Sequence, residues 1–198
     1  MKKSTRKTFI ALLSYTVLVI SLLFFILPMV WIIYCSFRTQ PSIFSGVIFA
    51  PLRDFTLENY RTILSVTDFP QYFYNSFRIA LSVTALSLFC SILGGYGLSR
   101  FRIRGKNAII MGIFSTQMFP QVLLIIPIYL IIFRFMLLDS TLGVVLGQAV
   151  LVLPFSIWML KGYFDSIPVD IENSAMIDGC NLFQRLVYVV LPVAAPGI

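Results

Sequence analysis

The chain has 198 residues, of which 59% are hydrophobic and 12% charged, and its mean hydropathy is +0.92. A soluble domain carries about 25% charged residues, so this composition excludes a soluble globular protein and indicates an integral membrane protein. The net charge of +7 sits in short clusters beside apolar runs, which favours membrane orientation over nucleic-acid binding. Histidine is absent and the three cysteines are scattered, which argues against acid–base catalysis, a disulfide framework or a metal site.

Long charge-free runs dominate the sequence and predict an all-α membrane fold. The first run, Thr8 to Phe37, is too long and bulky for a cleaved signal peptide, so it predicts a retained signal-anchor helix. Three more runs reach the roughly 20 residues that cross a hydrocarbon core. The four runs together predict a bundle of transmembrane helices over residues 9–36, 76–99, 107–133 and 141–160. Pro120 and Pro127 predict a kink or a tilt in the third.

Lysine and arginine residues set the expected orientation of these helices. With the N-terminus inside, the inner segments hold ten basic residues and the outer segments hold five. The positive-inside rule therefore places the N-terminus in the cytoplasm, segment 38–75 outside, and the chain that follows the fourth span inside again. Prolines and glycines punctuate the outer segment, which we expect to form a small ordered lobe.

A polar stretch, 165–192, interrupts the apolar runs and predicts two short helices. Asp170 and Glu172 follow Pro168, and negative charge is favourable in the first turn of a helix. Gly179 suits the left-handed position that ends this first helix. Helical periodicity gives the helix two partly apolar faces: Val169, Asn173, Met176 and Cys180 on one, and Ile171, Ala175 and Asp178 on the other. A helix of this kind suits insertion into a groove of a partner protein.

The second predicted helix of this stretch begins at Asn181. Gln184 stands three residues later, which is the spacing of a capping box. Pro192 is expected to end the helix, because the residue before a proline avoids the α region. The apolar run from Leu186 to Ile198 is ~20 Å long at 1.5 Å per residue, shorter than a hydrocarbon core, and its two prolines argue against one continuous helix.

This helix–glycine–helix pattern resembles the signature loop of ABC importer permeases. The family pattern is Glu-Ala-Ala, three residues, Gly, nine residues, Ile, one residue and Leu-Pro. The matching positions here are Asn173, Ser174, Ala175, Gly179, Val189, Leu191 and Pro192. The spacing agrees throughout, whereas Asn173, Ser174 and Val189 differ from the family's residues, and Glu172 stands one place before the family's Glu.

Further strings resemble the carbohydrate-uptake branch of these permeases, and most closely the maltose-type second, shorter permease. In order from Phe55 to Gly179 they are FTLENY, NSFRIA, GYGLSRF, QMFP, IPIY, LLDSTLG, LPFSIWMLKGYFDSIP and IDG. The resemblance implies the polytopic helical bundle of a type I ABC importer permease, with four complete transmembrane helices here and a cytoplasmic coupling-helix loop at 165–192. Since the family continues with two more spans, we expect residues 1–198 to be C-terminally truncated, with the fifth span cut off.

The resemblance implies a single permease domain that is a transporter subunit rather than an enzyme. The chain would form half of the translocation pathway for a sugar or oligosaccharide, beside a second permease subunit, and would bind no cofactor itself. ATP and Mg would lie on a partner ATPase dimer, and an extracellular or periplasmic substrate-binding protein would deliver the substrate. The implied location is the plasma membrane of a bacterium or archaeon.

The loop is the expected contact with the ATPase, and amides within the predicted spans are candidates for the substrate path. The loop candidates are Asp170, Glu172, Asn173, Ser174, Ala175, Asp178, Gly179, Leu191 and Pro192. The acidic ones among them either pair with basic groups of the partner or are solvated. Gln117, Gln121 and Gln148 lie within predicted spans, where their amides either bond sugar hydroxyls or form interhelical hydrogen bonds.

Other functions share some of these features. The permeases of polyamine or phosphate-ester importers carry the same loop and are one alternative. A non-transporting membrane anchor or assembly subunit is another. A membrane enzyme is disfavoured, because the sequence shows no histidine, no clustered intramembrane carboxylates and no nucleophile–base pair.

Overall fold

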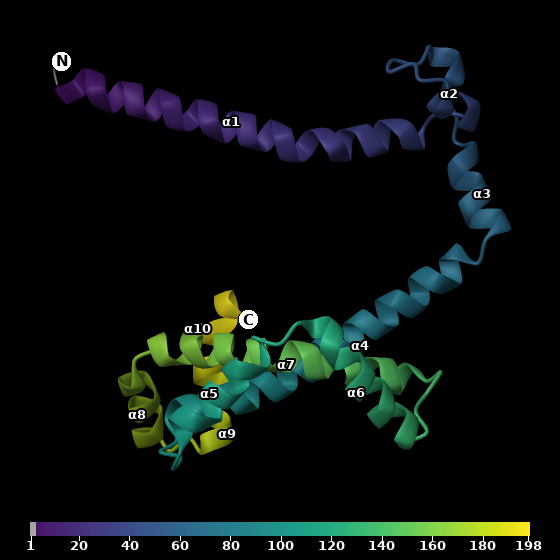
Figure 1. Cartoon of the computed structure of the whole chain (residues 1–198). Coiled ribbons are helices and arrows are strands. Elements are labelled where there is room, and N and C mark those ends of the chain that lie inside the picture. Colours follow the sequence, from purple (N-terminus) through teal and green to yellow (C-terminus); the bar gives the residue numbers. More distant parts are fainter. Residues whose placement is uncertain (1–2) are drawn as a thin grey trace. The chain divides into compact units, whose positions relative to one another are not determined.

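The computed structural model of the protein describes the backbone of residues 3–198 and the side chains of residues 7 and 9–198. Every regular element in this part of the chain is a helix, apart from an isolated antiparallel bridge between Arg38 and Phe55. The predicted all-α fold is therefore confirmed. The chain divides into two compact units, Met1–Phe73 and Tyr74–Ile198 (Figure 1).

The first unit consists of one long helix followed by a small lobe. Its elements are α1 (Lys3–Ser36), α2 (Gln40–Phe44), η1 (Leu52–Asp54) and α3 (Glu58–Val66). The 28 residues from Phe9 to Ser36 are long and apolar enough to cross a membrane. The lobe is held to the end of α1 by Asn59, whose Nδ2 donates to the carbonyl oxygens of Ser36 and Arg38 at 2.9 and 2.8 Å. The segment after α1 is therefore folded rather than extended.

The second unit contains two long helices, a bent helix pair and the loop that follows them. Its elements are α4 (Phe69–Arg100), α5 (Lys106–Thr116), α6 (Gln121–Arg134), α7 (Thr141–Ser166), α8 (Val169–Ile177), α9 (Leu182–Gln184), η2 (Arg185–Val190), α10 (Leu191–Ala194) and η3 (Ala195–Gly197). The helix α7 contacts both α5 and α6, so it forms the centre of this unit.

Three helices in the described part of the chain are long and apolar enough to span a membrane, and the number is four if a bent helix pair is counted as one span. The three are the Phe9–Ser36 part of α1, α4 and α7. The pair is α5 and α6, whose axes differ in direction by 100°. The expectation of one kinked or tilted helix over 107–133 is wrong, because the helix is interrupted after Thr116. Pro120 explains the interruption: it lacks an N–H donor and disfavours the α conformation in the residue before it.

The helices α4 and α7 approach closely near their C-terminal ends. A Cβ on Gly95 would lie 3.0 Å from the backbone nitrogen of Lys161 and 3.1 Å from the Cβ of Leu160, so glycine permits this crossing. A buried hydrophobic cluster lies beside it: Tyr96, Leu160, Phe164, Ile167, Leu186, Val190 and Ala194. The cluster packs the C-terminal ends of α4 and α7 against η2 and α10, and so holds the second half of the polar loop on these two helices.

The last helical run does not end at Pro192, contrary to the prediction. Helical geometry continues from Leu182 to Gly197, as α9, the π-helical η2, α10 and the 3₁₀-helical η3. A π-helix bonds each N–H to the fifth preceding carbonyl instead of the fourth, which shifts the hydrogen-bond pattern just before the proline. Such local adjustments let a helix in an apolar setting continue past a proline.

Candidate functional site

The polar loop is built around α8, whose end has the predicted glycine geometry. Gly179 has φ +85°, in the left-handed region. The N–H of Cys180 donates to the carbonyl of Ala175 at 3.0 Å, and the N–H of Gly179 donates to that of Met176 at 3.1 Å. This pair of bonds is the Schellman arrangement, which satisfies two carbonyls at the end of a helix. The prediction that Gly179 ends the first loop helix is confirmed.

The second loop helix begins with the predicted capping box. The side chain of Asn181 accepts from the backbone N–H of Gln184 at 2.9 Å, and the side chain of Gln184 accepts from the backbone N–H of Asn181 at 2.9 Å. Two donors at the helix start are therefore satisfied within the loop itself. Together with Gly179, this box fixes the turn between α8 and α9 without help from any partner.

One face of α8 is turned inward and carries a buried carboxylate. Glu172 accepts from the hydroxyl of Tyr96 at 2.8 Å through Oε2, and from Nε of Arg100 at 2.5 Å through Oε1. The side chains of Glu172 and Arg100 are only 4% and 11% exposed. The Nη2 atom of Arg100 also donates to the carbonyl of Ile167 at 3.1 Å, just before α8 begins. Because both carboxylate oxygens are bonded within the chain, Glu172 is neither solvated nor available to a partner's basic groups.

A second set of polar contacts extends this attachment to α7. Ser99 donates through Oγ to Asp165 at 2.6 Å and accepts from Nη1 of Arg100 at 3.1 Å. Asp165 also pairs with Lys161, one helical turn earlier on α7. Lys106, at the start of α5, donates to the carbonyl of Ser99 at 3.3 Å. The end of α4 is thus bonded to α5, α7 and α8, so a displacement of α8 has a direct polar route into two long helices.

The other face of α8 is exposed and partly apolar. The side chains of Val169, Met176 and Ile177 are largely exposed, as are those of Asn173 and Ser174. Both remaining acidic candidates, Asp170 and Asp178, are exposed as well. The second predicted face is divided, because Ala175 is buried while Ile171 is exposed. The helix therefore presents one apolar outer face above a firmly bonded inner face.

The last two candidates of the loop lie away from α8. Leu191 is half-buried and packs against the hydrophobic cluster, whereas Pro192 is exposed. Arg185 connects this part of the loop to α8, because its Nη1 lies 3.8 Å from the sulfur of Met176. Leu191 thus has a packing role in the structure, and the exposed residues of α8 are the part of the loop that a partner can reach.

The structure brings two of the three glutamine candidates together. Gln117 and Gln121 flank the break between α5 and α6, and with Thr116 they line a cavity of about 410 Å³ against α7. Gln148 is exposed and is not among the residues that line this cavity. The i, i+4 spacing of Gln117 and Gln121 already predicted that they lie near each other, and the break places Gln117 at the end of α5 and Gln121 at the start of α6.

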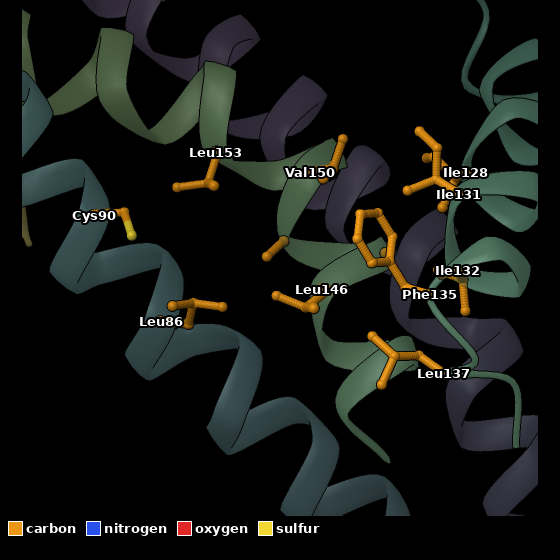
Figure 2. A pocket seen from close by; sticks show the side chains of 12 residues that line it. Leu86, Cys90, Ile128, Ile131, Ile132, Phe135, Leu137, Leu146, Val150 and Leu153 are labelled. Atoms are coloured by element: carbon orange, nitrogen blue, oxygen red, sulfur yellow. The ribbon is translucent and has the colours of Figure 1, made fainter. Parts of the chain in front are cut away.

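A second cavity, of about 520 Å³, is apolar and lies between α4, α6 and α7. Figure 2 shows its wall, with Leu86 and Cys90 from α4, Leu146, Val150 and Leu153 from α7, and Ile128, Ile131, Ile132 and Phe135 from α6 and its end. A sugar would lose its hydration there without gaining hydrogen bonds, so this cavity does not suit a polar substrate.

Two residues of the site were missed from the sequence. Tyr96 and Arg100 lie four positions apart on α4 and both bond to Glu172. Their i, i+4 spacing places them on one helix face, which was the available signal. In the sequence, Arg100 is only one of the ten basic residues of the inner segments. No local pattern relates it to Glu172, which lies more than seventy residues away.

Comparisons with known proteins agree with this architecture. The family described as binding-protein-dependent transport system inner membrane component matches residues 87–198, more than half of the chain. The chain is 36% identical over 171 residues to the sulfoquinovosyl glycerol transport system permease protein SmoH of Agrobacterium fabrum, which covers 86% of this chain and 60% of that protein. It is 31% identical to the trehalose/maltose transport system permease protein MalG of Thermococcus litoralis, over 100% of this chain and 70% of that protein.

A solved structure gives the same result at the level of the fold. One chain of a bacterial ABC transporter involved in the import of the acidic polysaccharide alginate has a TM-score of 0.74 and 27% sequence identity, over 100% of this chain and 68% of its own. The present chain spans less than two thirds of the length of the first relative named above. It is a multi-pass membrane protein with the type I permease fold, and it belongs to the family of binding-protein-dependent transport system inner membrane components.

Proposed function

We propose that the chain is a permease subunit of an ATP-driven importer and forms half of a translocation pathway for a sugar or oligosaccharide. The relatives support the substrate class, because their names refer to sulfoquinovosyl glycerol and to trehalose and maltose. The alginate importer, whose substrate is a polysaccharide, supports it too. A polyamine or phosphate-ester substrate and a non-transporting role have no such support.

The single observation that carries the proposal is the two-sided character of α8. Its outer face exposes Met176, Ile177 and Val169, and an apolar helix face of this kind fits a groove on a partner protein. Its inner face is bonded through Glu172 to α4. A partner that moves the outer face therefore moves the long helices as well. We assign the partner as an ATPase subunit that carries ATP and Mg, with hydrolysis taking place on that subunit.

The proposed transport step follows from this connection. Closure of an ATPase dimer on ATP displaces α8 of this chain and the equivalent helix of a second permease. The polar contacts of Arg100 and Asp165 transmit the displacement to α4 and α7, and the pathway between the two permeases changes from inward-facing to outward-facing. A binding protein delivers the substrate on the outer side. This chain performs no covalent chemistry and holds no cofactor.

The proposed topology places the N-terminus and the loop at 165–192 in the cytoplasm of a bacterial or archaeal cell. The proposed spans are 9–36, 76–99 and 141–160, together with the bent α5–α6 pair taken as one broken span over 107–133. Segment 38–75 lies outside, and the spans together form a single permease domain. The basic residues support this orientation, ten inside against five outside. It puts the exposed face of α8 on the side of the membrane where ATP is available.

Within the pathway, we propose that Gln117 and Gln121 contact the substrate. Their amides line the same cavity as Thr116, and an amide both donates to and accepts from sugar hydroxyls. The position at the break between α5 and α6 supports this role, because irregular backbone inside a membrane occurs where it lines a cavity. Gln148 lies outside this cavity and is the weaker candidate.

Co-purification of the ATPase tests the proposal with a matched pair of variants at one position. Met176→Glu places a charge on the exposed apolar face, whereas Met176→Leu keeps the face apolar. We expect an affinity-tagged chain, co-expressed with the second permease, the ATPase and the binding protein, to retain the ATPase with leucine and to lose most of it with glutamate. Uptake of radiolabelled sugars should follow the same order. Equal retention of the ATPase in both variants would show that α8 is not the element that binds the ATPase.

A further inference from the structure

The lobe after α1 exposes several large apolar side chains that lie close together in the sequence. Phe44, Ile48, Phe49 and Leu52 are 86%, 61%, 84% and 89% exposed. No charged residue occurs from Thr39 to Leu52. Exposed apolar patches of this kind mark contacts with a membrane or with another protein. We refer to segment 44–52, which connects α2 to η1, as the apolar tip.

The backbone of the apolar tip is bonded to the end of α1 at two points. The N–H of Ala50 donates to the hydroxyl of Tyr34 at 2.6 Å, and Nη2 of Arg38 donates to the carbonyl of Val47 at 2.9 Å. Ile48 and Phe49 lie between these two points. Arg38 is itself buried and lies 5.4 Å from the centre of the Tyr34 ring. The N–H of Ala50 and the carbonyl of Val47 are thus satisfied by Tyr34 of α1 and by Arg38 just after it, while the side chains of Ile48 and Phe49 are exposed.

This attachment fixes the depth of the apolar tip relative to a bilayer. The apolar part of α1 has 28 residues, about 42 Å at 1.5 Å per residue, whereas the hydrocarbon core is about 30 Å thick. If the helix is centred, each end extends about 6 Å beyond the core, and Tyr34 lies about 3 Å outside it. The rings of Trp31 and Tyr34, with centroids 5.5 Å apart, suit the aromatic belt found at this depth. Phe49 adjoins the residue bonded to Tyr34, so it lies at the interface too.

We propose that the apolar tip inserts into the interfacial region of the bilayer, in the leaflet next to the C-terminal end of α1, with Ile48 and Phe49 against the acyl-chain boundary. The partner is therefore lipid, and the tip fixes the height of the lobe on the membrane. Arg53, which follows the tip, is 86% exposed; its Nε lies 3.8 Å from Asp54, and its other donors are suited to contact a lipid phosphate.

Two observations favour lipid over a protein partner. The tip is bonded at the level of Tyr34, whereas a soluble binding protein approaches from the water beyond the headgroups. The tip also lacks charged residues, which protein interfaces commonly use to steer and orient a partner. The last turns of α1 are likewise apolar and exposed, at Ile32 and Ile33.

Fluorescence quenching in the assembled importer tests this proposal. The native cysteines are replaced by serine, Phe49→Cys is labelled with a small fluorophore, and the complex is placed in nanodiscs. Phosphatidylcholine with a spin label near the headgroup end of its acyl chain serves as the lipid quencher, and iodide as the aqueous one. The control is Glu58→Cys, at an exposed charged position in the first turn of α3. Ile48→Cys repeats the measurement if Phe49→Cys prevents assembly.

The expected result is that the probe at 49 loses most of its fluorescence to the spin-labelled lipid and little to iodide, with the reverse at 58. Equal quenching of both probes by iodide would show that the tip is in water. Protection of position 49 from both quenchers would show that a protein subunit covers it. Either of these two results overturns the proposal, whether or not the complex transports sugar.

Discussion

Replacing Glu172 by glutamine removes the negative charge that holds α8 on α4. Loss of one partner from a buried ion pair costs about 3–5 kcal/mol, because the other charge stays buried without compensation. Arg100 keeps its contacts with Ile167 and Ser99, so the lower end of this range applies, about 3 kcal/mol. At about 1.4 kcal/mol for each factor of ten, α8 should open roughly 100-fold more often.

Amide hydrogen exchange of the chain in nanodiscs measures this opening directly. The matched control is Asp170→Asn, which makes the same chemical change two residues earlier on the exposed side of α8. Its only expected cost is a weaker interaction with the helix dipole, about 0.3–1 kcal/mol, or at most about fivefold faster exchange. Two results would refute the role of the buried pair. One is amide exchange in 169–177 that accelerates equally in both variants, and the other is an acceleration of less than about fivefold in Glu172→Gln.

Three further variants test other parts of the account. Gly179→Val should reduce substrate-stimulated ATPase activity more than Asn173→Ala, since the left-handed φ costs a side chain about 1–2 kcal/mol although the surrounding space is open; an equal loss would contradict this. Gly95→Ala should lower the melting temperature through its contact with the α7 backbone, whereas Gly97→Ala should not, because the nearest atom to the added Cβ is a ring carbon of Phe101 at 4.0 Å; the reverse order would argue against the close helix crossing. Glu58→Cys, in a cysteine-free background, should react with an impermeant thiol reagent in intact cells, because position 58 is exposed and lies in the segment proposed to be outside; reaction only after permeabilisation would show that the topology is inverted.

Features of the loop that depend on a few neighbouring residues were predictable from the sequence. The capping box at Asn181 and Gln184 and the left-handed turn at Gly179 both occur as expected. Each arises because a side chain or a glycine satisfies backbone groups within the same turn, so no distant residue is needed. The all-α architecture is predictable for the same reason, since hydrophobic length alone determines it.

Features that depend on tertiary contacts were not predictable. Asp170 and Glu172 look alike in the sequence, yet one is exposed and the other is buried against Tyr96 and Arg100. The rotation of α8 about its own axis against α4 decides which of the two acids is buried. The local sequence pattern does not specify that rotation. The continuation of the helix past Pro192 has a similar origin, because the hydrophobic cluster holds η2 and α10 in place.

Photocrosslinking from α8 in native membranes tests the central claim, that this chain engages an ATPase through the exposed face of that helix. A photoreactive amino acid replaces Met176, which is exposed, or Ala175, its buried neighbour, and ultraviolet light is applied in cells that express the whole importer. The account predicts a covalent adduct between this chain and the ATPase from position 176, and little or none from position 175. An assembled importer that transports sugar but gives no ATPase adduct from position 176 would contradict it.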